Sequence, residues 1–363
     1  MSEIITERLQ LTSEIRHTFP ASHQLYLAFG GCTINVGLNS EELNRVLRQY
    51  FKPFIAGPTD PQIVITVHEA GRQLNYSYSV KQPDPGKAKI KEEFCDIDGG
   101  RIVHKRLTGM QFIFGQGDNL AVGPCLKNPN QVINFINNRF IEWKLQQGAI
   151  LGHAAGVQHK GRGLALAGFS GMGKSTLALH LMSKGTSFVS NDRLLVNKSG
   201  ADLLMAGVAK LPRVNPGTVL NNPDLTVTIP EEERRQFAEL PLDQLWMLEH
   251  KYDVDIDACF GKNRFIIESP MHGLLILNWN RESTDDFSFR TVSLDERPDL
   301  LSAFMKSTGL FYLPYQKDTA LDASQDEYLE HLRRITVFEA SGPVNFDLAA
   351  LKCLQFLESG KII

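Results

Sequence analysis

The stretch Gly168-Phe-Ser-Gly-Met-Gly-Lys174-Ser175 decides the fold, because it joins a short apolar run to a segment with helical spacing. The run 163–167 before it is short enough for a buried strand. The segment 176–182 after it is apolar at helical spacing and contains no Gly or Pro. A glycine-rich turn between a strand and a helix is the context in which the pattern G-x-x-x-x-G-K-[ST] indicates a phosphate-binding loop, or P-loop.

The residue types of this stretch match the chemistry of phosphate binding. Backbone N–H groups must come close to phosphate oxygens, which explains Gly168, Gly171 and Gly173. The helix that begins at Lys174 adds its positive end, and the lysine ammonium can reach the β- and γ-phosphates. The Ser175 hydroxyl can bind Mg²⁺. The alternative is a chance glycine-rich turn before a helix, which leaves these position-specific residues unexplained.

Composition bounds the class of protein. A chain of 363 residues favours two domains, and its hydrophobic content of 42% and charged content of 22% are those of an ordinary globular protein. The net charge of −3 predicts no basic surface, so we expect no nucleic-acid partner. Five scattered cysteines without a C-x-x-C pair favour a reducing compartment. With no secretion signal or membrane-spanning run, we expect a cytoplasmic protein without a membrane partner.

Residues 1–145 are predicted to form an α+β module, and residues 146–363, which include the P-loop, a second domain. Apolar spacing, Asn and Ser at helix starts, and Gly or Pro at turns define its expected elements. They are a helix within 1–20, strands 25–29 and 33–36, a helix beginning after Ser40, a strand 63–67, a loop 83–90, strands and turns over 94–122, and a helix beginning at 128–130.

The second domain continues with alternating elements after the P-loop helix, which Gly185 ends. Its expected elements are a strand 186–190, an extended segment 194–196, a proline-rich stretch 212–241 that is mostly loop with a helix start at 230–236, strands 273–277 and 287–292, a helix 298–305, a strand 335–339 and a helix 346–357.

A P-loop site also needs an acidic residue for Mg²⁺ at the end of a strand beside the P-loop strand. Asp192 is the candidate, because it follows the predicted strand 186–190. The alternative is an aspartate that caps a turn. His153 precedes the P-loop strand, and from chemistry alone a single histidine is more often packed or exposed than functional.

Taken together, these residues resemble the kinase core of the HPr kinase/phosphorylase family. The resemblance is carried by Gly152-His153, by the loop 168–175, by Lys184-Gly185 and by Asn191-Asp192-Arg193, with matching spacing. It is close over 150–200 and looser over the rest of the C-terminal half. The whole chain most resembles HPr-kinase-related proteins, whose substrates the resemblance does not imply. The implied fold is α/β, a P-loop kinase core of the phosphoenolpyruvate-carboxykinase-like type, with the N-terminal α+β module added.

The resemblance also implies roles for individual residues. Ser175 and Asp192 would hold Mg²⁺, and His153 would lie in the catalytic centre beside the acid. The phosphates of ATP would be held by Gly168, Ser170, Gly171, Met172, Gly173, Lys174, Ser175 and Thr176.

Two departures from the family pattern affect the chemistry. The family has an Asp-Asp pair whose first member is the proposed general base, and Asn191 stands there in this chain. An amide cannot accept the acceptor proton, so another group does so, transfer proceeds without a strong base, or transfer has been lost. The family's Arg-Gly-Leu-Gly signature is absent. Arg213 and Asn215 stand in that region, either as a phosphate-charge and substrate pair or as parts of a solvated loop. The polar segment 250–255 is either a substrate-side loop or a solvated turn.

The predicted function is ATP- and Mg²⁺-dependent phosphoryl transfer to a hydroxyl, with a serine on a protein as the favoured acceptor. A small-molecule kinase, of the type that acts on free serine, belongs to the same class. The alternative from another class is a nucleotide-binding regulatory subunit without transfer, for which Asn191 is the reason. For the predicted kinase, the expected partner is an unidentified protein or small-molecule phosphate acceptor. The resembled family forms rings, so we also expect a homo-oligomer.

Overall fold

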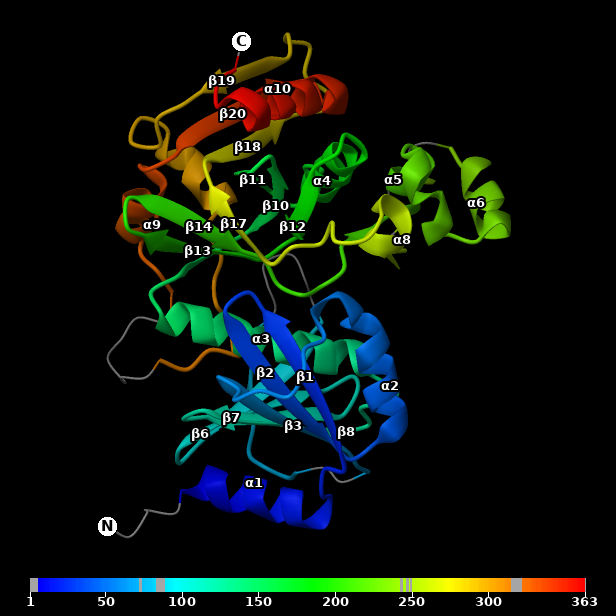
Figure 1. Cartoon of the computed structure of the whole chain (residues 1–363), viewed down its shortest axis with the longest axis vertical. Coiled ribbons are helices and arrows are strands. Elements are labelled where there is room, and N and C mark those ends of the chain that lie inside the picture. Colours follow the sequence, from blue (N-terminus) through cyan, green and yellow to red (C-terminus); the bar gives the residue numbers. More distant parts are fainter. Residues whose placement is uncertain are drawn as a thin grey trace. The chain divides into compact units, whose positions relative to one another are not determined.

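The computed structural model describes residues 6–71, 74–82, 89–241, 244–245, 248, 250–314 and 322–362. The chain divides into two compact units (Figure 1). The N-terminal unit comprises Met1–Gln146 and Thr308–Leu321, and the C-terminal unit comprises Gln147–Ser307 and Asp322–Ile363. The sequence predicted a boundary at 145 but no return of 308–321 to the first unit. Most of the predicted loop 83–90 falls outside the described residues.

The described part of the N-terminal unit is built on one mixed sheet of eight strands. Two of its pairings, β2 with β3 and β3 with β8, are parallel, and the others are antiparallel. In sheet order the strands are β1 (His23–Phe29), β2 (Cys32–Leu38), β3 (Ile63–Glu69), β8 (Asp118–Gly123), β7 (Met110–Gly115), β6 (Gly100–Lys105), β5 (Glu92–Ile97) and β4 (Ser79–Val80).

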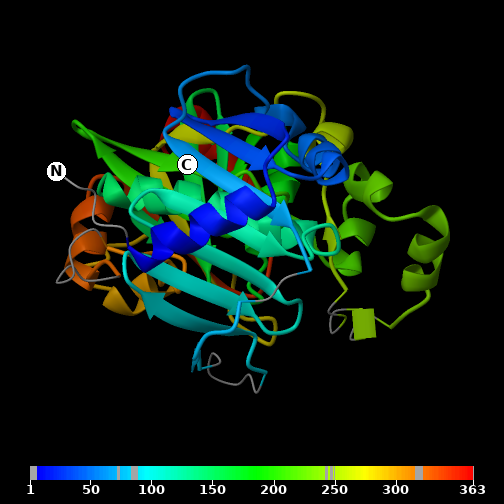
Figure 2. The ribbon, with the colours of Figure 1, turned by 90° about the horizontal axis from the view of Figure 1, so that it is seen from below.

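Helices cover both faces of this sheet. Figure 2 shows α1 (Glu7–Thr18) lying across the strands, where its Ile15 belongs to one buried cluster with Ile113. Successive residues of a strand point to opposite faces, so the ring of Phe112 lies on the other face, 4.8 Å from Phe135 of α3 (Pro129–Gln146). The remaining helices are α2 (Glu41–Tyr50), which Ser40 caps as predicted, and the 3-10 helix η1 (Lys52–Phe54).

A segment from late in the chain completes the core of the N-terminal unit. Phe311 packs its ring against Phe112 and Phe114, at centroid distances of 5.5 and 5.7 Å. Its carbonyl oxygen accepts a hydrogen bond from Arg139, whose guanidinium is fully buried over the Phe114 ring. One aromatic side chain and one buried cation thus explain why 308–314 pack with this unit rather than with the residues beside them in sequence.

The described part of the C-terminal unit contains three sheets, and the architecture is mixed α/β. The six-stranded sheet has the order β12 (Ser187–Ser190), β10 (Ala154–His159), β11 (Arg162–Gly168), β18 (Gly273–Trp279), β20 (Thr336–Gly342) and β19 (Ser288–Thr291). The four-stranded sheet has the order β17 (Glu268–Met271), β14 (Asp202–Ala206), β13 (Leu194–Ser199) and β9 (Ile150–Gly152), and β15 (Arg213–Val214) pairs with β16 (Tyr252–Asp253).

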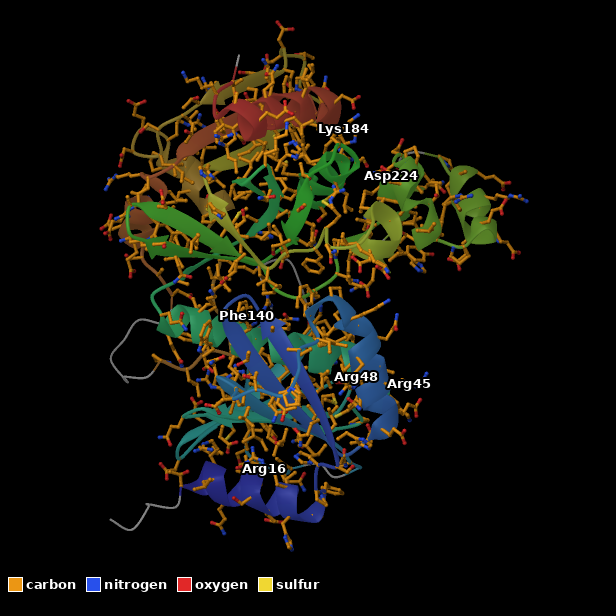
Figure 3. The ribbon with its side chains drawn as sticks, in the orientation of Figure 1. Arg16, Arg45, Arg48, Phe140, Lys184 and Asp224 are labelled. Atoms are coloured by element: carbon orange, nitrogen blue, oxygen red, sulfur yellow. The ribbon has the colours of Figure 1, made fainter. Side chains whose placement is uncertain are left out.

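The helices of the C-terminal unit correct one prediction. The proline-rich stretch 212–241 is largely helical rather than loop, because Pro216 and Pro223 stand at helix starts, where a missing N–H costs nothing. Figure 3 labels Asp224 in this region. Within the described residues, the helices with defined bounds are α4 (Lys174–Ser183), α5 (Pro216–Leu220), η2 (Pro223–Thr228), α6 (Glu231–Ala238), α8 (Ile256–Phe260), η3 (Pro298–Ala303), α9 (Gln325–Leu332) and α10 (Phe346–Ser359).

Two buried clusters hold the six-stranded sheet. Leu166, Leu177 and Phe356 belong to the cluster that joins the sheet to α4 and α10, and Ala167 and Phe304 belong to the cluster on the other side. The strand 163–167 predicted before the glycine-rich loop is therefore buried from both directions. In the part of the chain described here, no helix combines the length and apolar character that crossing a membrane requires.

Candidate functional site

The glycine-rich loop connects the end of β11 to the start of α4, as predicted. Gly171 and Gly173 both have a φ of +84°, a backbone conformation that residues other than glycine rarely adopt. A Cβ atom at Gly173 would also lie 2.6 Å from the Phe346 ring. Glycine at 173 is thus required by both the backbone conformation and the space available, and it allows the chain to turn from strand into helix within a few residues.

The first turn of α4 offers backbone donors. Gly173 is its N-cap residue and no side chain caps it, so the first N–H groups of the helix are not used by a capping side chain. Ser170 and Gly171 are exposed, and Ser175 and Thr176 are half-buried in the first turn. Unused N–H groups and the positive end of a ten-residue helix form an arrangement that favours an anion.

Lys174 places a cation at the base of the loop. Its side chain is buried, and Nζ donates to the carbonyl oxygens of Gly168 at 2.6 Å and Phe169 at 3.3 Å. Burial lowers the pKa of the Lys174 ammonium to about 8, and the positive charge of Lys306 acts in the same direction, while Asp192 opposes both. The ammonium is still mostly protonated at neutral pH, so it can serve as a counter-charge for phosphate.

The sheet order corrects the predicted position of the acid. Asp192 follows β12, but β12 is not beside the loop strand, because β10 lies between β12 and β11. Since β10 runs antiparallel to both, its beginning lies at the same sheet edge as the ends of the other two strands. That edge therefore brings together His153, which immediately precedes β10, the loop after β11 and Asn191-Asp192.

Asp192 is the centre of a charged cluster at this edge. Its Oδ1 lies 3.0 Å from Nε2 of His153, and its Oδ2 lies 3.5 Å from Nζ of Lys306. Partial burial raises the pKa of the Asp192 carboxyl, but the hydrogen bond from His153 and the charge of Lys306 outweigh this effect. The resulting pKa is well below the usual range, so the carboxylate is ionised throughout the physiological pH range.

Packing holds both partners of Asp192 in place. Gly152 forms an isolated bridge with Met305, and a Cβ atom at Gly152 would lie 2.3 Å from the Phe304 ring, so only glycine fits there. The N–H of His153 donates to the carbonyl oxygen of Phe304 at 2.6 Å. Lys306 comes two residues after Phe304, so the same packing positions it. No motif in the sequence indicates its role. Only the fold shows that it belongs to the site.

Further cations lie within electrostatic range of the acid. Burial lowers the pKa of Lys210, and the nearby charges of Arg193 and Arg213 lower it further, while Asp192 acts in the opposite direction. Arg213 itself is half exposed and forms an ion pair with Asp253 at 3.2 Å. Because β15 (Arg213–Val214) pairs with β16 (Tyr252–Asp253), Arg213 and the polar segment 250–255, which were predicted separately, meet in one short two-stranded ribbon.

Two amide oxygens near these cations have unused hydrogen-bonding capacity. The Oδ1 atoms of Asn191 and Asn215 are buried and have no hydrogen-bond partner among the described residues. The hydroxyl of Thr218, in α5, lies 3.1 Å from that of Thr176, in α4. Because an unpaired buried acceptor costs free energy, Asn191 and Asn215 are positions where a bound donor would stabilise the protein.

Two nearby polar side chains have structural partners. Arg264 donates to the carbonyl oxygen of Met182 in the last turn of α4 and to that of Thr186 just after the helix. Asp255 caps α8 by accepting from the N–H of Ala258 at 3.1 Å. These contacts stabilise helix ends, so neither side chain is available as a ligand group without breaking a cap.

The fit of Mg²⁺ depends on Asp192 and Ser175. The described residues contain no group of three or more His, Cys, Asp or Glu side chains that could hold a metal ion. Mg²⁺ in nucleotide sites takes most of its ligands from phosphate and water and one or two from carboxylates. One ionised carboxylate and a hydroxyl in the first turn of α4 therefore fit a magnesium ion that arrives with a nucleotide, rather than a resident metal centre.

Comparisons with known proteins give little independent evidence about the function of this chain. No protein-family model matches the sequence, and no curated protein matches it. Among solved structures, the chain is similar to the Hpr(Ser) kinase/phosphatase from Coxiella burnetii, with 13% sequence identity and a TM-score of 0.29. The similarity covers 58% of this chain and 94% of that chain. Because a similarity this weak establishes no activity, we infer function from the site residues themselves.

Proposed function

We propose that the C-terminal unit is a P-loop kinase of the HPr-kinase type, which binds ATP with Mg²⁺ and transfers the γ-phosphoryl group to a hydroxyl. A serine on a protein is the favoured acceptor. The observation that carries the proposal is the meeting, at one sheet edge, of the glycine-rich loop with Lys174 and of Asp192 with His153 and Lys306. A loop that favours anions beside an ionised acid and several cations suits phosphoryl transfer, which depends mostly on positioning and charge.

The groups at this sheet edge would each have a role in the transfer of the γ-phosphoryl group. The oxygen of the acceptor hydroxyl bonds to the γ-phosphorus, the bond from that phosphorus to the bridging oxygen breaks, and ADP leaves with the electron pair. The N–H groups of the loop and the ammonium groups of Lys174 and Lys306 offset the phosphate charge. Asp192 and Ser175 would hold Mg²⁺, which supplies further charge neutralisation when bound.

The proton of the hydroxyl needs an acceptor, because Asn191 cannot take it. Asp192 is a poor base, since its pKa is low. Imidazole exchanges protons near neutral pH, and His153 donates Nε2–H to Asp192, which leaves Nδ1 as the ring nitrogen that can accept a proton. His153 is therefore our candidate for the general base, oriented by Asp192. Asn191 is then a hydrogen-bond acceptor for the substrate.

Binding of MgATP to wild type and to Lys174→Ala tests the site, with isothermal titration calorimetry as the measurement. We expect binding to the wild type and its loss in the variant. Lys198→Ala is the matched control, because Lys198 pairs with Glu330 on the surface. Equal affinity of the wild type and Lys174→Ala for MgATP would show that the loop is not the nucleotide site.

A nucleotide-binding regulatory subunit without transfer is the second candidate, and Asn191 is the observation that favours it. The two are separated by incubation with ATP labelled at the γ-phosphate, with serine peptides, candidate proteins and free serine as acceptors. Transfer to a protein or peptide supports the first proposal, and transfer to free serine indicates the small-molecule kinase. Binding without transfer, unchanged in Asn191→Asp, supports the regulatory subunit.

The N-terminal unit is proposed to recognise the acceptor or to build a homo-oligomer. The described partners of Asp192 in the charged cluster, His153 and Lys306, both belong to the C-terminal unit. Light scattering on the full chain measures the oligomeric state directly. A monomer that phosphorylates its acceptor would leave recognition as the role to test.

A further inference from the structure

A cleft of about 600 Å³ opens beside the glycine-rich loop within the C-terminal unit. Residues 170–172 of the loop form one wall, the segment 278–282 at the end of β18 forms another, and Val344 and Phe346 complete it. None of these residues belongs to the charged cluster around Asp192. The kinase reaction described so far therefore leaves this cleft without a role.

The cleft and the charged cluster lie on opposite sides of the loop. β18 and β20 run parallel to β11, so their carboxyl ends, which carry 278–282 and lead to Val344, lie at the same sheet edge as the loop (Figure 1). The sheet order puts β10 and β12 on one side of β11, with His153 and Asp192, and β18 and β20 on the other. A phosphate chain in the loop thus has an acid and cations beyond one end and the cleft beyond the other.

The cleft has a fixed apolar wall and a polar rim. The indole N–H of Trp279 donates to the carbonyl oxygen of Met172 at 2.9 Å, which ties the strand end to the loop. The Trp279 ring packs edge-on against Phe346, at a centroid distance of 5.1 Å. Asn280 and Glu282 are exposed at the rim. An apolar wall with a few polar groups is the usual make-up of a small-molecule site, and its volume is in the usual range of about 300–1,000 Å³.

We infer that this cleft holds the nucleoside of the bound nucleotide, so that the terminal phosphate faces Asp192. The inference rests on the proposed function, and it assigns the direction in which the nucleotide lies across the loop. The base packs against the wall formed by Val344 and Phe346, and the ribose hydroxyls meet the polar rim. The alternative direction would place the terminal phosphate in the cleft, where Arg281 is a cation in the lining but Glu282 and the aromatic wall stand beside it, and would leave the acid, His153 and Lys306 next to a neutral base.

Two probes separate the cleft from the loop. MgATP has a triphosphate and a nucleoside, whereas magnesium tripolyphosphate has only the phosphate chain, so the difference in their affinities measures what the nucleoside adds. The variant Glu282→Trp fills the rim of the cleft from an exposed position. Asp286→Trp is the matched control, because Asp286 is exposed, loses the same charge and does not line the cleft.

We expect the wild type to bind MgATP at least about tenfold more tightly than magnesium tripolyphosphate by calorimetry, a difference of about 1.4 kcal/mol or more, because only MgATP has a base to bury in the cleft. Glu282→Trp should lose that preference and keep its affinity for tripolyphosphate, and Asp286→Trp should keep both. Equal affinity of the wild type for the two probes overturns the inference while leaving the loop as a phosphate site. A full ATP preference in Glu282→Trp also overturns it. If the wild type binds neither probe, the proposed function itself fails.

Discussion

Nε2 of His153 lies 3.0 Å from Oδ1 of Asp192, although the two residues belong to different strand ends with the loop strand and its helix between them in sequence. The contact exists because β10 is inserted antiparallel between β11 and β12. This arrangement places an imidazole and a carboxylate beside the glycine-rich loop and fixes their mutual orientation. In the proposed reaction, this pair is the candidate for taking the proton of the acceptor hydroxyl.

Replacing His153 should separate binding from transfer. If His153 takes the proton of the acceptor hydroxyl, His153→Gln should lower kcat by about 10²- to 10⁴-fold, with a change in MgATP affinity of less than about threefold. Steady-state kinetics and calorimetry measure the two quantities. His159→Gln is the control, because His159 lies at the opposite end of β10. An unchanged kcat in His153→Gln would remove this residue from the mechanism.

Lys306 should contribute charge rather than shape. Its ammonium forms an ion pair with Oδ2 of Asp192 at 3.5 Å, and in the proposed reaction it offsets the charge of the phosphoryl group in transfer. Loss of one such electrostatic group typically costs about 10²- to 10³-fold in rate, so we expect Lys306→Met to reduce kcat/KM by up to about that factor. Lys306→Arg should recover part of the loss because it restores the charge. Equal activity of Lys306→Met and the wild type would show that the ion pair is only structural.

Nucleotide affinity should fall with rising pH, because the pKa of Lys174 is lowered to about 8. The protonated ammonium attracts phosphate, and bound phosphate stabilises it, so the pKa rises on binding. Affinity is then constant below pH of about 8 and decreases above it, by up to tenfold per pH unit for the loss of one proton. Calorimetry of MgATP binding between pH 7 and 9.5 measures this. Lys174→Arg should remain flat over that range, and a flat wild-type profile would contradict the assignment.

Elements whose backbone is determined by neighbouring residues could be predicted from the sequence. The loop between β11 and α4 was predicted because glycine, lysine and serine occupy fixed positions between an apolar run and a helical one. The start of α2 was predicted from Ser40, whose side chain accepts from the N–H of Leu43 at 3.3 Å. In both cases, neighbouring residues along the chain determine the backbone, so no knowledge of distant packing was needed.

Contacts between residues that are far apart in the sequence could not be predicted. Lys306 belongs to the cluster because Phe304 packs against Gly152, a contact that no pattern in either segment indicates. The insertion of β10 beside the loop strand is likewise a property of strand pairing, which a single sequence does not specify. The return of Phe311 to the N-terminal unit depends on a buried Arg139 that sequence alone would place on the surface. Such contacts follow from tertiary packing and not from local propensity.

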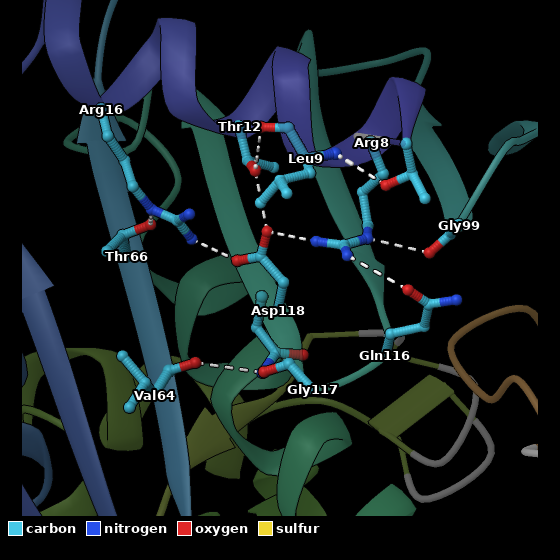
Figure 4. Close-up of polar contacts among 12 residues, drawn as sticks. Arg8, Leu9, Thr12, Arg16, Val64, Thr66, Gly99, Gln116, Gly117 and Asp118 are labelled. Atoms are coloured by element: carbon cyan, nitrogen blue, oxygen red, sulfur yellow. Dashed lines mark hydrogen bonds and ion pairs between the residues drawn. The ribbon is translucent and has the colours of Figure 1, made fainter. Parts of the chain in front are cut away.

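A last prediction concerns the polar cluster that attaches α1 to the sheet of the N-terminal unit (Figure 4). The Asp118 carboxylate accepts hydrogen bonds from Arg8, Thr12 and Arg16 of the helix. Burial raises the pKa of Asp118, but the hydrogen bond and charge of Arg16 outweigh it, so the pKa is lowered. A lowered pKa means that this stabilisation is complete above pH of about 4 and is lost as the pH falls further.

Asp118→Asn should therefore cost about 3 kcal/mol of the free energy that holds α1, because Arg8 would keep its buried charge without a counter-charge. Amide hydrogen exchange of α1, corrected for the intrinsic rate, measures this free energy. We expect protection of the wild-type helix to fall below pH 4, and that of Asp118→Asn to be low at every pH. Asp60→Asn, at an exposed position, is the control. A helix equally protected in Asp118→Asn and the wild type would mean that apolar packing of Leu11 and Ile15 alone holds α1.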